Sequence, residues 1–167
     1  MIIKEIRVWD EIYVPDKILF RREQLSRLDE CLQGAFKYGR ASNALCIGDF
    51  GVGKTASIRH ILKQAGKESK EKDILLKYYY FNCADFAQTG KSITLNRIVS
   101  YILQEEGIKG IYPTLPWEVK FEKFKDLIRN FHSTVLVLDE IDFYLHQTGN
   151  DFQTLAYIFS RSLSGTS

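Results

Sequence analysis

Residues 48–55, Gly-Asp-Phe-Gly-Val-Gly-Lys-Thr, constrain the fold of this chain more than any other segment. They match the pattern of two glycines with four residues between them followed by Lys-Thr, with Gly51 as an extra glycine before the lysine. Glycines allow backbone N–H groups to close around an anion, and a following helix presents its positive N-terminal end to that anion. The segment therefore predicts a phosphate-binding loop between a strand and a helix.

The flanking sequence supports this prediction. The apolar run Ala44–Ile47 predicts a buried parallel strand, and Ile58, Ile61, Leu62 and Ala65 are spaced as one face of a helix. The alternative is a plain glycine turn before a helix with an exposed lysine. In the phosphate-loop interpretation, Lys54 neutralises the β- and γ-phosphates and Thr55 binds Mg²⁺ through its hydroxyl. The residues predicted to bind the nucleotide here are Gly48, Asp49, Phe50, Gly51, Val52, Gly53, Lys54, Thr55 and Ala56.

A second apolar run, Thr134–Leu138, predicts another buried strand and is followed by Asp139 and Glu140. A parallel strand delivers such carboxylates to the ligand edge of the sheet, where they need a cation. We expect Asp139 to hold Mg²⁺ through its water shell, together with Thr55. Glu140 is expected to orient or deprotonate the attacking water, and Lys54 is the other predicted catalytic residue. The alternative is that the two carboxylates cap the next helix.

The remaining sequence alternates between helical and strand patterns. Helices are predicted from Arg22 to about Gly39 and over 93–103, 121–131 and 152–163, and a strand over 74–83. The mixed-charge run 67–73 is predicted to be an exposed connection. This order predicts an α/β fold with a parallel sheet covered on both faces. Residues 78–80 are three adjacent tyrosines, which could stack on nucleic-acid bases. Because side chains alternate along a strand, we expect them instead to pack on opposite faces of the sheet.

Composition limits the function classes. At 167 residues the chain is long enough for one domain, and its net charge of +2 does not by itself argue for nucleic acid. Three cysteines without paired spacing predict core residues, not a zinc or disulfide framework, and the histidines are too scattered for a metal site. No apolar run reaches the roughly 20 residues that span a bilayer. The N-terminus does not resemble a signal peptide, so we expect no membrane partner and an intracellular protein.

Besides the glycine-rich loop, five segments carry a family resemblance, and one of them contains the acidic motif. They are Tyr13-Val14-Pro15, Phe20–Leu25, Tyr80–Cys83, Leu138–Asp142 and Leu155–Arg161. With them the chain resembles the AAA+ ATPases of the origin-recognition and cell-division-control replication initiator family. The resemblance implies a P-loop NTPase three-layer sandwich with a parallel sheet that is truncated before the sensor strand. It also implies a lead-in segment over 1–20 and the N-terminal portion of the ATPase domain over 21–167.

The same resemblance implies the ligands and partners. ATP or ADP with Mg²⁺ is the expected cofactor, and the adenine is expected to contact Tyr13, Val14, Pro15 and Arg21. Expected partners are double-stranded DNA through the longer protein, and other AAA+ subunits in homo- or hetero-oligomers. In many relatives the segment corresponding to 107–117 helps to contact DNA, although a surface loop with a packed tryptophan is favoured here. The protein is expected in the cytoplasm, or in the nucleus if eukaryotic.

Elements of the family that are missing from this sequence lead to a further hypothesis. The family's next strand carries a sensor residue and lies between the phosphate-loop strand and the Asp139 strand; a lid and a winged-helix domain follow. Without that strand the sheet has a central gap. We therefore expect either the N-terminal part of a longer protein, or a truncated relative whose gap is filled by a partner or by its own N-terminal segment.

Other function classes remain open at this point. One is a transposition or signal-transduction ATPase with the same nucleotide core, which a preference for origin-like DNA would exclude. Another is a nucleotide-binding module that does not hydrolyse ATP, which measured turnover would exclude. A small-molecule kinase is the least favoured, because no acceptor-binding lid or arginine-rich closing segment is evident.

Overall fold

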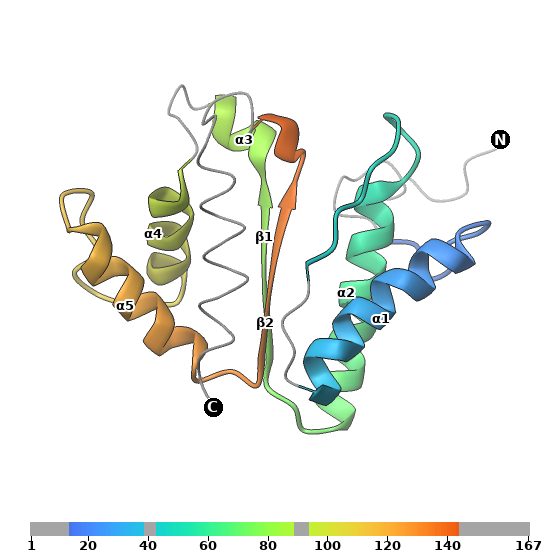
Figure 1. The fold of residues 1–167 in the computed structure, drawn as a ribbon, viewed down its shortest axis with the longest axis horizontal. Helices are drawn as coiled ribbons and strands as arrows, with labels where there is room; N and C mark the ends of the chain where they lie inside the picture. Colours follow the sequence, from blue (N-terminus) through green and yellow to red (C-terminus); the bar gives the residue numbers. More distant parts are fainter. Residues whose placement is uncertain (1–13, 39–42, 89–93, 144–167) are drawn as a thin grey trace, which may run out of the picture.

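The computed structural model describes residues 14–38, 43–88 and 94–143. Figure 1 shows a parallel sheet in the middle, with α4 and α5 on one face and α1 and α2 on the other. This arrangement confirms the predicted α/β fold. The elements in chain order are α1 (Arg22–Tyr38), α2 (Lys54–Glu71), β1 (Leu76–Asn82), α3 (Cys83–Gln88), α4 (Leu95–Glu105), α5 (Trp117–Ile128) and β2 (Ser133–Asp139).

The sheet of the described residues has two strands. β1 and β2 run parallel, in a register from Leu76 opposite Ser133 to Asn82 opposite Asp139. Because side chains alternate along a strand, Tyr79 and Phe81 point to one face, where each is buried to 3% exposure. Tyr80 points to the opposite face, toward α2. The predicted separation of the adjacent tyrosines onto two faces is therefore confirmed.

The main core lies between the sheet and α4 and α5. The helical spacing of apolar residues in α4 turns one stripe of that helix inward, and Thr94 caps its start by accepting a hydrogen bond from the N–H of Arg97. A buried lysine joins α5 to this core, since the Lys120 ammonium donates to Asn96 at 2.9 Å and to the carbonyl of Pro113 at 3.3 Å. The most deeply buried members of the core are Cys83, Ile98, Val99, Ile102 and Leu103.

The second helical layer is built from α1 and α2. The two helices pack on each other, and the Gln33 side chain of α1 donates to Glu68 of α2 at 2.9 Å. Helix α2 runs to Glu71, so the prediction of a connection beginning at residue 67 is wrong. The charged residues of this segment suggested a loop, but lysine and glutamate are good helix formers. The Glu68–Lys72 ion pair, across one turn, stabilises this end of the helix.

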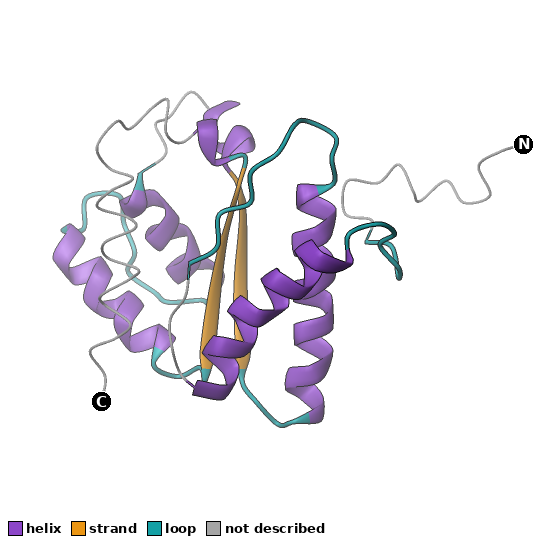
Figure 2. Cartoon of the chain, turned by 45° about the vertical axis from the view of Figure 1, so that its right-hand side comes forward, coloured by secondary structure: helices purple, strands orange, loops and turns teal. Residues whose placement is uncertain are grey.

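Residues 43–47 form no strand. They lie alongside β2 as extended chain without joining the sheet, and Figure 2 draws them as loop. Leu45 is 67% exposed and Ile47 is 86% exposed. The prediction of a buried strand over Ala44–Ile47 is wrong for this chain, because an apolar strand is buried only when a neighbouring strand and helices cover it. The phosphate-loop segment and β2 are not adjacent partners, which is consistent with the expected gap.

The helices predicted over 93–103 and 121–131 are present as α4 and α5, although α5 begins earlier, at Trp117. The short helix α3 was not predicted. The expected extended N-terminal segment and the final helix over 152–163 lie outside the described residues. Within the described part of the chain, none of the helices combines the length and apolar character needed to cross a membrane.

Candidate phosphate-binding site

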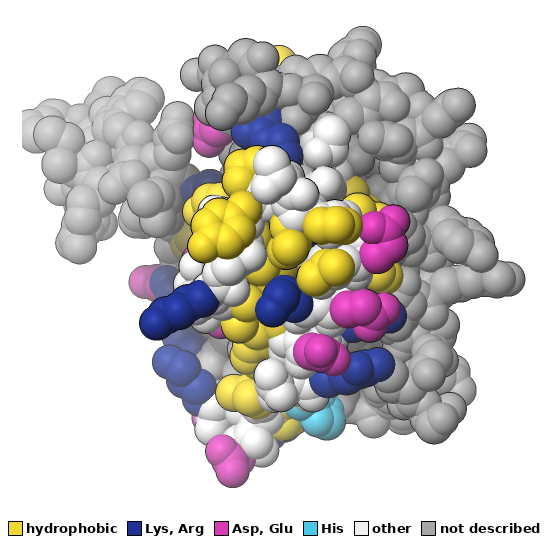
Figure 3. All heavy atoms as spheres, turned by 90° about the vertical axis from the view of Figure 1, so that its left-hand side faces the viewer, with side chains coloured by type: hydrophobic (Ala, Val, Ile, Leu, Met, Phe, Trp, Pro, Cys, Tyr) yellow, Lys and Arg dark blue, Asp and Glu magenta, His cyan; other side chains and the backbone are white. Residues whose placement is uncertain are grey.

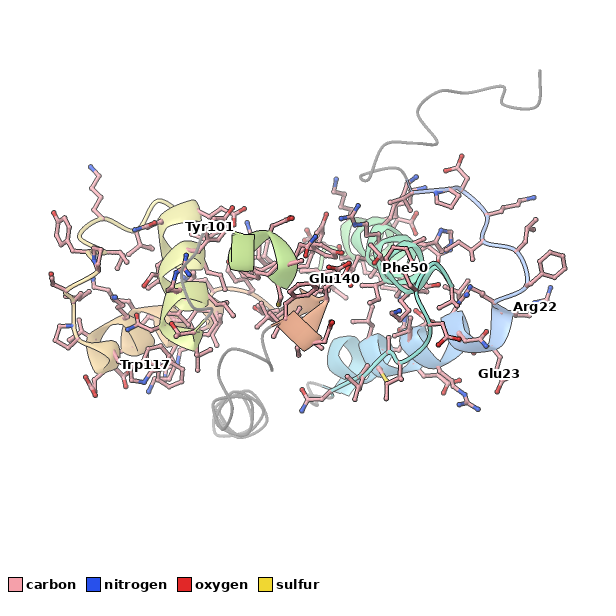
Figure 4. The ribbon with its side chains drawn as sticks, turned by 90° about the horizontal axis from the view of Figure 1, so that it is seen from above. Arg22, Glu23, Phe50, Tyr101, Trp117 and Glu140 are labelled. Carbon is pink, nitrogen blue, oxygen red and sulfur yellow. The ribbon has the colours of Figure 1, made fainter. Side chains whose placement is uncertain are left out.

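The glycine-rich loop leads directly into α2, as its sequence predicts, and two of its glycines have left-handed backbone. Gly51 and Gly53 have φ of 75° and 82°, in the left-handed region that glycine adopts without steric cost. Gly53 is the N-cap of α2 and no side chain caps this helix end. The first N–H groups of α2 therefore remain available to an anion. The tip of the loop is solvent-facing, with Phe50 at 97% exposure (Figure 4).

Lys54 holds the loop closed. Its ammonium donates to the carbonyl oxygens of Gly48, at 2.7 Å, and Asp49, at 2.9 Å. Both acceptors are neutral, so a phosphate oxygen, which carries charge, would be a stronger partner for the same ammonium. The lysine is already at the loop that is expected to receive the phosphates.

Thr55 connects the loop to the acidic end of β2. Its hydroxyl donates to Oδ2 of Asp139 at 2.7 Å, although the two residues are 84 positions apart in the sequence. Asp139 is 9% exposed, and its Oδ1 accepts the N–H of Glu140 at 3.0 Å. The fold thus brings together the two residues predicted to bind the metal.

These oxygen donors fit Mg²⁺ chemically. Mg²⁺ prefers hard oxygen ligands and is usually held by one or two carboxylates together with substrate phosphates and water. Over residues 14–38, 43–88 and 94–143 there is no cluster of three or more His, Cys, Asp or Glu that would enclose a metal ion. The Thr55 hydroxyl and the Asp139 carboxylate supply oxygen ligands of the kind that Mg²⁺ prefers.

Glu140 is exposed at the end of β2, between α3 and α2 in Figure 4. Its φ of 50° is left-handed, which is uncommon for a residue with a side chain. Strained backbone of this kind is often found at functional sites. Asp142, two residues later, is also exposed.

Tyr80 and Arg59 also belong to this site, and sequence reasoning did not identify them. The Tyr80 hydroxyl donates to Oδ2 of Asp139, and the Arg59 guanidinium carbon lies 4.7 Å from the centre of the Tyr80 ring. Burial and the hydrogen bond to Asp139 raise the pKa of Tyr80 to about 12, so the phenol stays protonated near neutral pH. The sequence signal that could have pointed to Tyr80 was its even spacing from Asn82, which places the two side chains on one face of β1. In the structure Asp139 lies on that same face of the sheet.

The predicted adenine contacts lie on the N-terminal side of the loop. Arg21 is beside Gly53, since its Nε would be 3.5 Å from a Cβ at that glycine. Val14 and Pro15 are partly buried, and the carbonyl of Pro15 lies 3.0 Å from Nδ1 of His60 on α2. The exposed ion pair of Lys63 with Asp16 attaches the same segment to α2. Tyr13 lies outside the described residues.

Comparisons with known proteins point to one family. The AAA ATPase domain model matches residues 17–163. The chain is 33% identical over 150 residues to the ORC1-type DNA replication protein 1 of Aeropyrum pernix, covering 89% of this chain and 36% of that protein. It is 32% identical over 142 residues to the ORC1-type DNA replication protein 1 of Methanosarcina mazei, covering 84% of this chain and 33% of that protein.

Two solved structures share the fold. The Aeropyrum pernix ORC1 protein in complex with DNA has a TM-score of 0.70 and 29% identity, over 90% of this chain and 38% of that one. The ORC2 protein of the same organism, in ADPNP-ADP complexes, has a TM-score of 0.69 and 23% identity, over 93% of this chain and 40% of that one. The chain thus spans about a third of the length of its curated relatives. With the family model covering nearly all of it, the chain belongs to the AAA ATPase domain family and is similar to ORC1-type DNA replication proteins.

Proposed function

We propose that this chain binds ATP or ADP with Mg²⁺ at the loop of residues 48–56 and hydrolyses ATP, as the nucleotide module of a DNA replication initiator. The observation that carries the proposal is the 2.7 Å hydrogen bond between Thr55 and Asp139. It joins the anion-binding loop and the acidic strand end into one site, as phosphoryl-transfer chemistry requires.

Each residue has a distinct task in this proposal. Backbone N–H groups of the loop and the Lys54 ammonium hold the phosphates, with Lys54 exchanging its carbonyl partners for phosphate oxygens. Thr55 and Asp139 would hold Mg²⁺, which supplies positive charge for the phosphate oxygens when bound. Glu140 accepts a proton from the attacking water or orients it. Arg21, which lies beside Gly53, contacts the adenine together with Tyr13, Val14 and Pro15.

The replication role is supported by the relatives, all those compared above being ORC1-type or ORC proteins, and one of them having been solved with DNA. These similarities favour an initiator over a transposition or signalling ATPase. We propose that double-stranded DNA and other AAA+ subunits are bound by the longer protein, in the cytoplasm or, in a eukaryote, the nucleus.

For DNA, the candidate segment of this chain is 107–117. Lys109 and Tyr112 are exposed there, on the side of the molecule that carries α4 and α5, where Figure 3 shows hydrophobic side chains among charged ones. Trp117 is half-buried and its ring stacks on Phe121 with centroids 5.1 Å apart, which supports a packing role for the tryptophan.

Calorimetric titration with ATP and with ADP, in the presence of Mg²⁺, tests the proposed site. Lys54→Ala should weaken binding by about 10- to 100-fold, since a hydrogen bond to a charged group is worth about 1.5–3 kcal/mol. Lys70→Ala is the matched control, because Lys70 is exposed on the same helix and lies in its last turn, at the opposite end from the loop. It should leave the affinity within about twofold. Equal affinities for the wild type and Lys54→Ala would contradict the proposed site.

The exposed apolar side chains of residues 43–47 support a second proposal, on how the sheet is completed. Among the described residues β2 pairs with β1 alone, so a further strand could pair with the other edge of β2 and with the extended apolar segment 43–47 beside it. We propose that a parallel strand of the longer protein, C-terminal to Ser167, pairs with both and covers Leu45 and Ile47. The greater length of the curated relatives supports a source within the same protein.

Hydrogen exchange measures this directly. In the 167-residue chain the amides of residues 45–47 should exchange within seconds to minutes, because no described strand pairs with them. In the longer protein they should be slowed by about two orders of magnitude or more, while the amides of the β1–β2 pair are protected in both. Fast exchange at residues 45–47 in the longer protein would exclude the added strand.

A further inference from the structure

Tyr80 makes a contact that the phosphate loop alone does not require. Its hydroxyl donates to Oδ2 of Asp139, the same oxygen that accepts the Thr55 hydroxyl. The sheet register explains how it reaches this oxygen. Tyr80 is opposite Val137, so Asp139 is its diagonal neighbour on the same face of the sheet, within reach of a long side chain.

The aromatic ring of Tyr80 is also held from the other side. Arg59 of α2 lies over the ring at 4.7 Å, one helical turn beyond Thr55. The tyrosine is therefore located between the helix that follows the loop and the strand that ends in Asp139. This position leaves its hydroxyl little freedom to choose another acceptor.

Together these contacts fix the plane of one buried carboxylate. Oδ2 of Asp139 accepts two hydroxyl groups, from Thr55 and Tyr80, and Oδ1 accepts the N–H of Glu140. A carboxylate with hydrogen bonds to both oxygens cannot rotate without breaking them, and its low exposure limits replacement by water. The partners of a metal-binding side chain set its orientation and its affinity for the metal.

We propose that Tyr80 is a positioning residue that holds Asp139 in the orientation needed for Mg²⁺-nucleotide. The proposal rests on the proposed function, since it concerns the metal side of the same site. It assigns the effect to the hydroxyl group of Tyr80. A tyrosine that served only to pack against Arg59 would use its ring, and loss of the hydroxyl would then change nothing at the metal.

Tyr80→Phe removes the hydroxyl and keeps the ring. The measurement is ATP binding by calorimetry over a range of Mg²⁺ concentrations, and again in EDTA. In Tyr80→Phe the Mg²⁺ concentration for half-maximal enhancement of binding should rise by about tenfold or more, while affinity in EDTA stays within about twofold. The matched control is Tyr78→Phe, which removes a hydroxyl two residues earlier on the same strand face, from a side chain that is 49% exposed. It should leave both quantities unchanged, and melting temperatures should show that both variants fold.

A second background separates positioning from a general disturbance of the site. In Asp139→Ala the carboxylate is gone, so adding Tyr80→Phe should change the remaining Mg²⁺ dependence by no more than about twofold. A full tenfold effect in that background would overturn the role through Asp139, as would identical Mg²⁺ dependence of the wild type and Tyr80→Phe. Absence of any nucleotide binding by the folded wild type would instead overturn the proposed function, and this inference with it.

Discussion

Glu140→Gln should lower the rate of ATP hydrolysis by about 10²- to 10⁴-fold and leave nucleotide affinity within a few-fold. The amide has nearly the same shape but accepts no proton, and general base catalysis contributes about that factor. Phosphate release under saturating ATP measures the rate, and calorimetry measures the affinity. Turnover that is equal in the wild type and the variant would exclude Glu140 as the base. Binding without turnover in the wild type would favour the non-hydrolysing alternative.

Glu140→Gly is the companion variant, because the same residue has left-handed backbone with φ of 50°. Left-handed backbone costs a residue with a side chain about 1–2 kcal/mol, and glycine is free of this cost. Both variants should be inactive, and the glycine variant should have a free energy of unfolding about 1 kcal/mol above that of the glutamine variant. Urea denaturation compares them. Equal stabilities would mean that the backbone at this position is not strained.

Ile102→Ala should lower the free energy of unfolding by about 2–5 kcal/mol. Ile102 is 0% exposed, in the C-terminal half of α4, within the core that α4 forms with the sheet and α5. Removing three carbon atoms there leaves a cavity, because the closely packed side chains around it cannot move far enough to fill the space. Since whole domains are stable by about 5–15 kcal/mol, this single change threatens the fold. Urea denaturation followed by circular dichroism measures the loss.

Glu105→Ala provides the control for Ile102→Ala. Glu105 is on the same helix, is exposed, and lies outside the hydrophobic core. Its removal should change the free energy of unfolding by no more than about 0.5 kcal/mol. If Ile102→Ala were as mild as this control, the core would not be located where the buried side chains of α4 indicate.

The sequence predicted those helices and strands whose apolar spacing can be seen within the element itself. The helix from Arg22, α4 and both strands of the sheet were found because apolar spacing reflects local geometry. Ala44–Ile47 shows the limit of this reasoning. Its composition is that of a buried strand, but pairing and burial depend on a neighbour that no local pattern supplies. The length of α2 was misjudged because a charged, exposed helix end has the composition of a loop.

The candidate site was predicted in the same uneven way. Lys54, Thr55 and Asp139 were identified because their chemistry follows from short motifs, and the fold brings the last two within hydrogen-bond distance. Tyr80 was not identified, because its contact with Asp139 depends on the register between two strands far apart in the sequence. The position of Arg21 beside Gly53 likewise depends on tertiary contacts, since the segment before Arg21 packs against α2 through Pro15 and Asp16.

In the part of the chain that the structure describes, one edge of β2 has no strand partner, and this affects how the chain behaves in solution. An unpaired strand edge beside exposed apolar side chains is a template for pairing with another molecule, so the edge of β2 together with Leu45 and Ile47 makes self-association a competitor of correct completion of the sheet. A strand supplied by the same polypeptide has an effective concentration on the order of millimolar, which a second copy at micromolar concentration does not reach. Covalent continuity of the strand with the domain would thus protect the protein from aggregation.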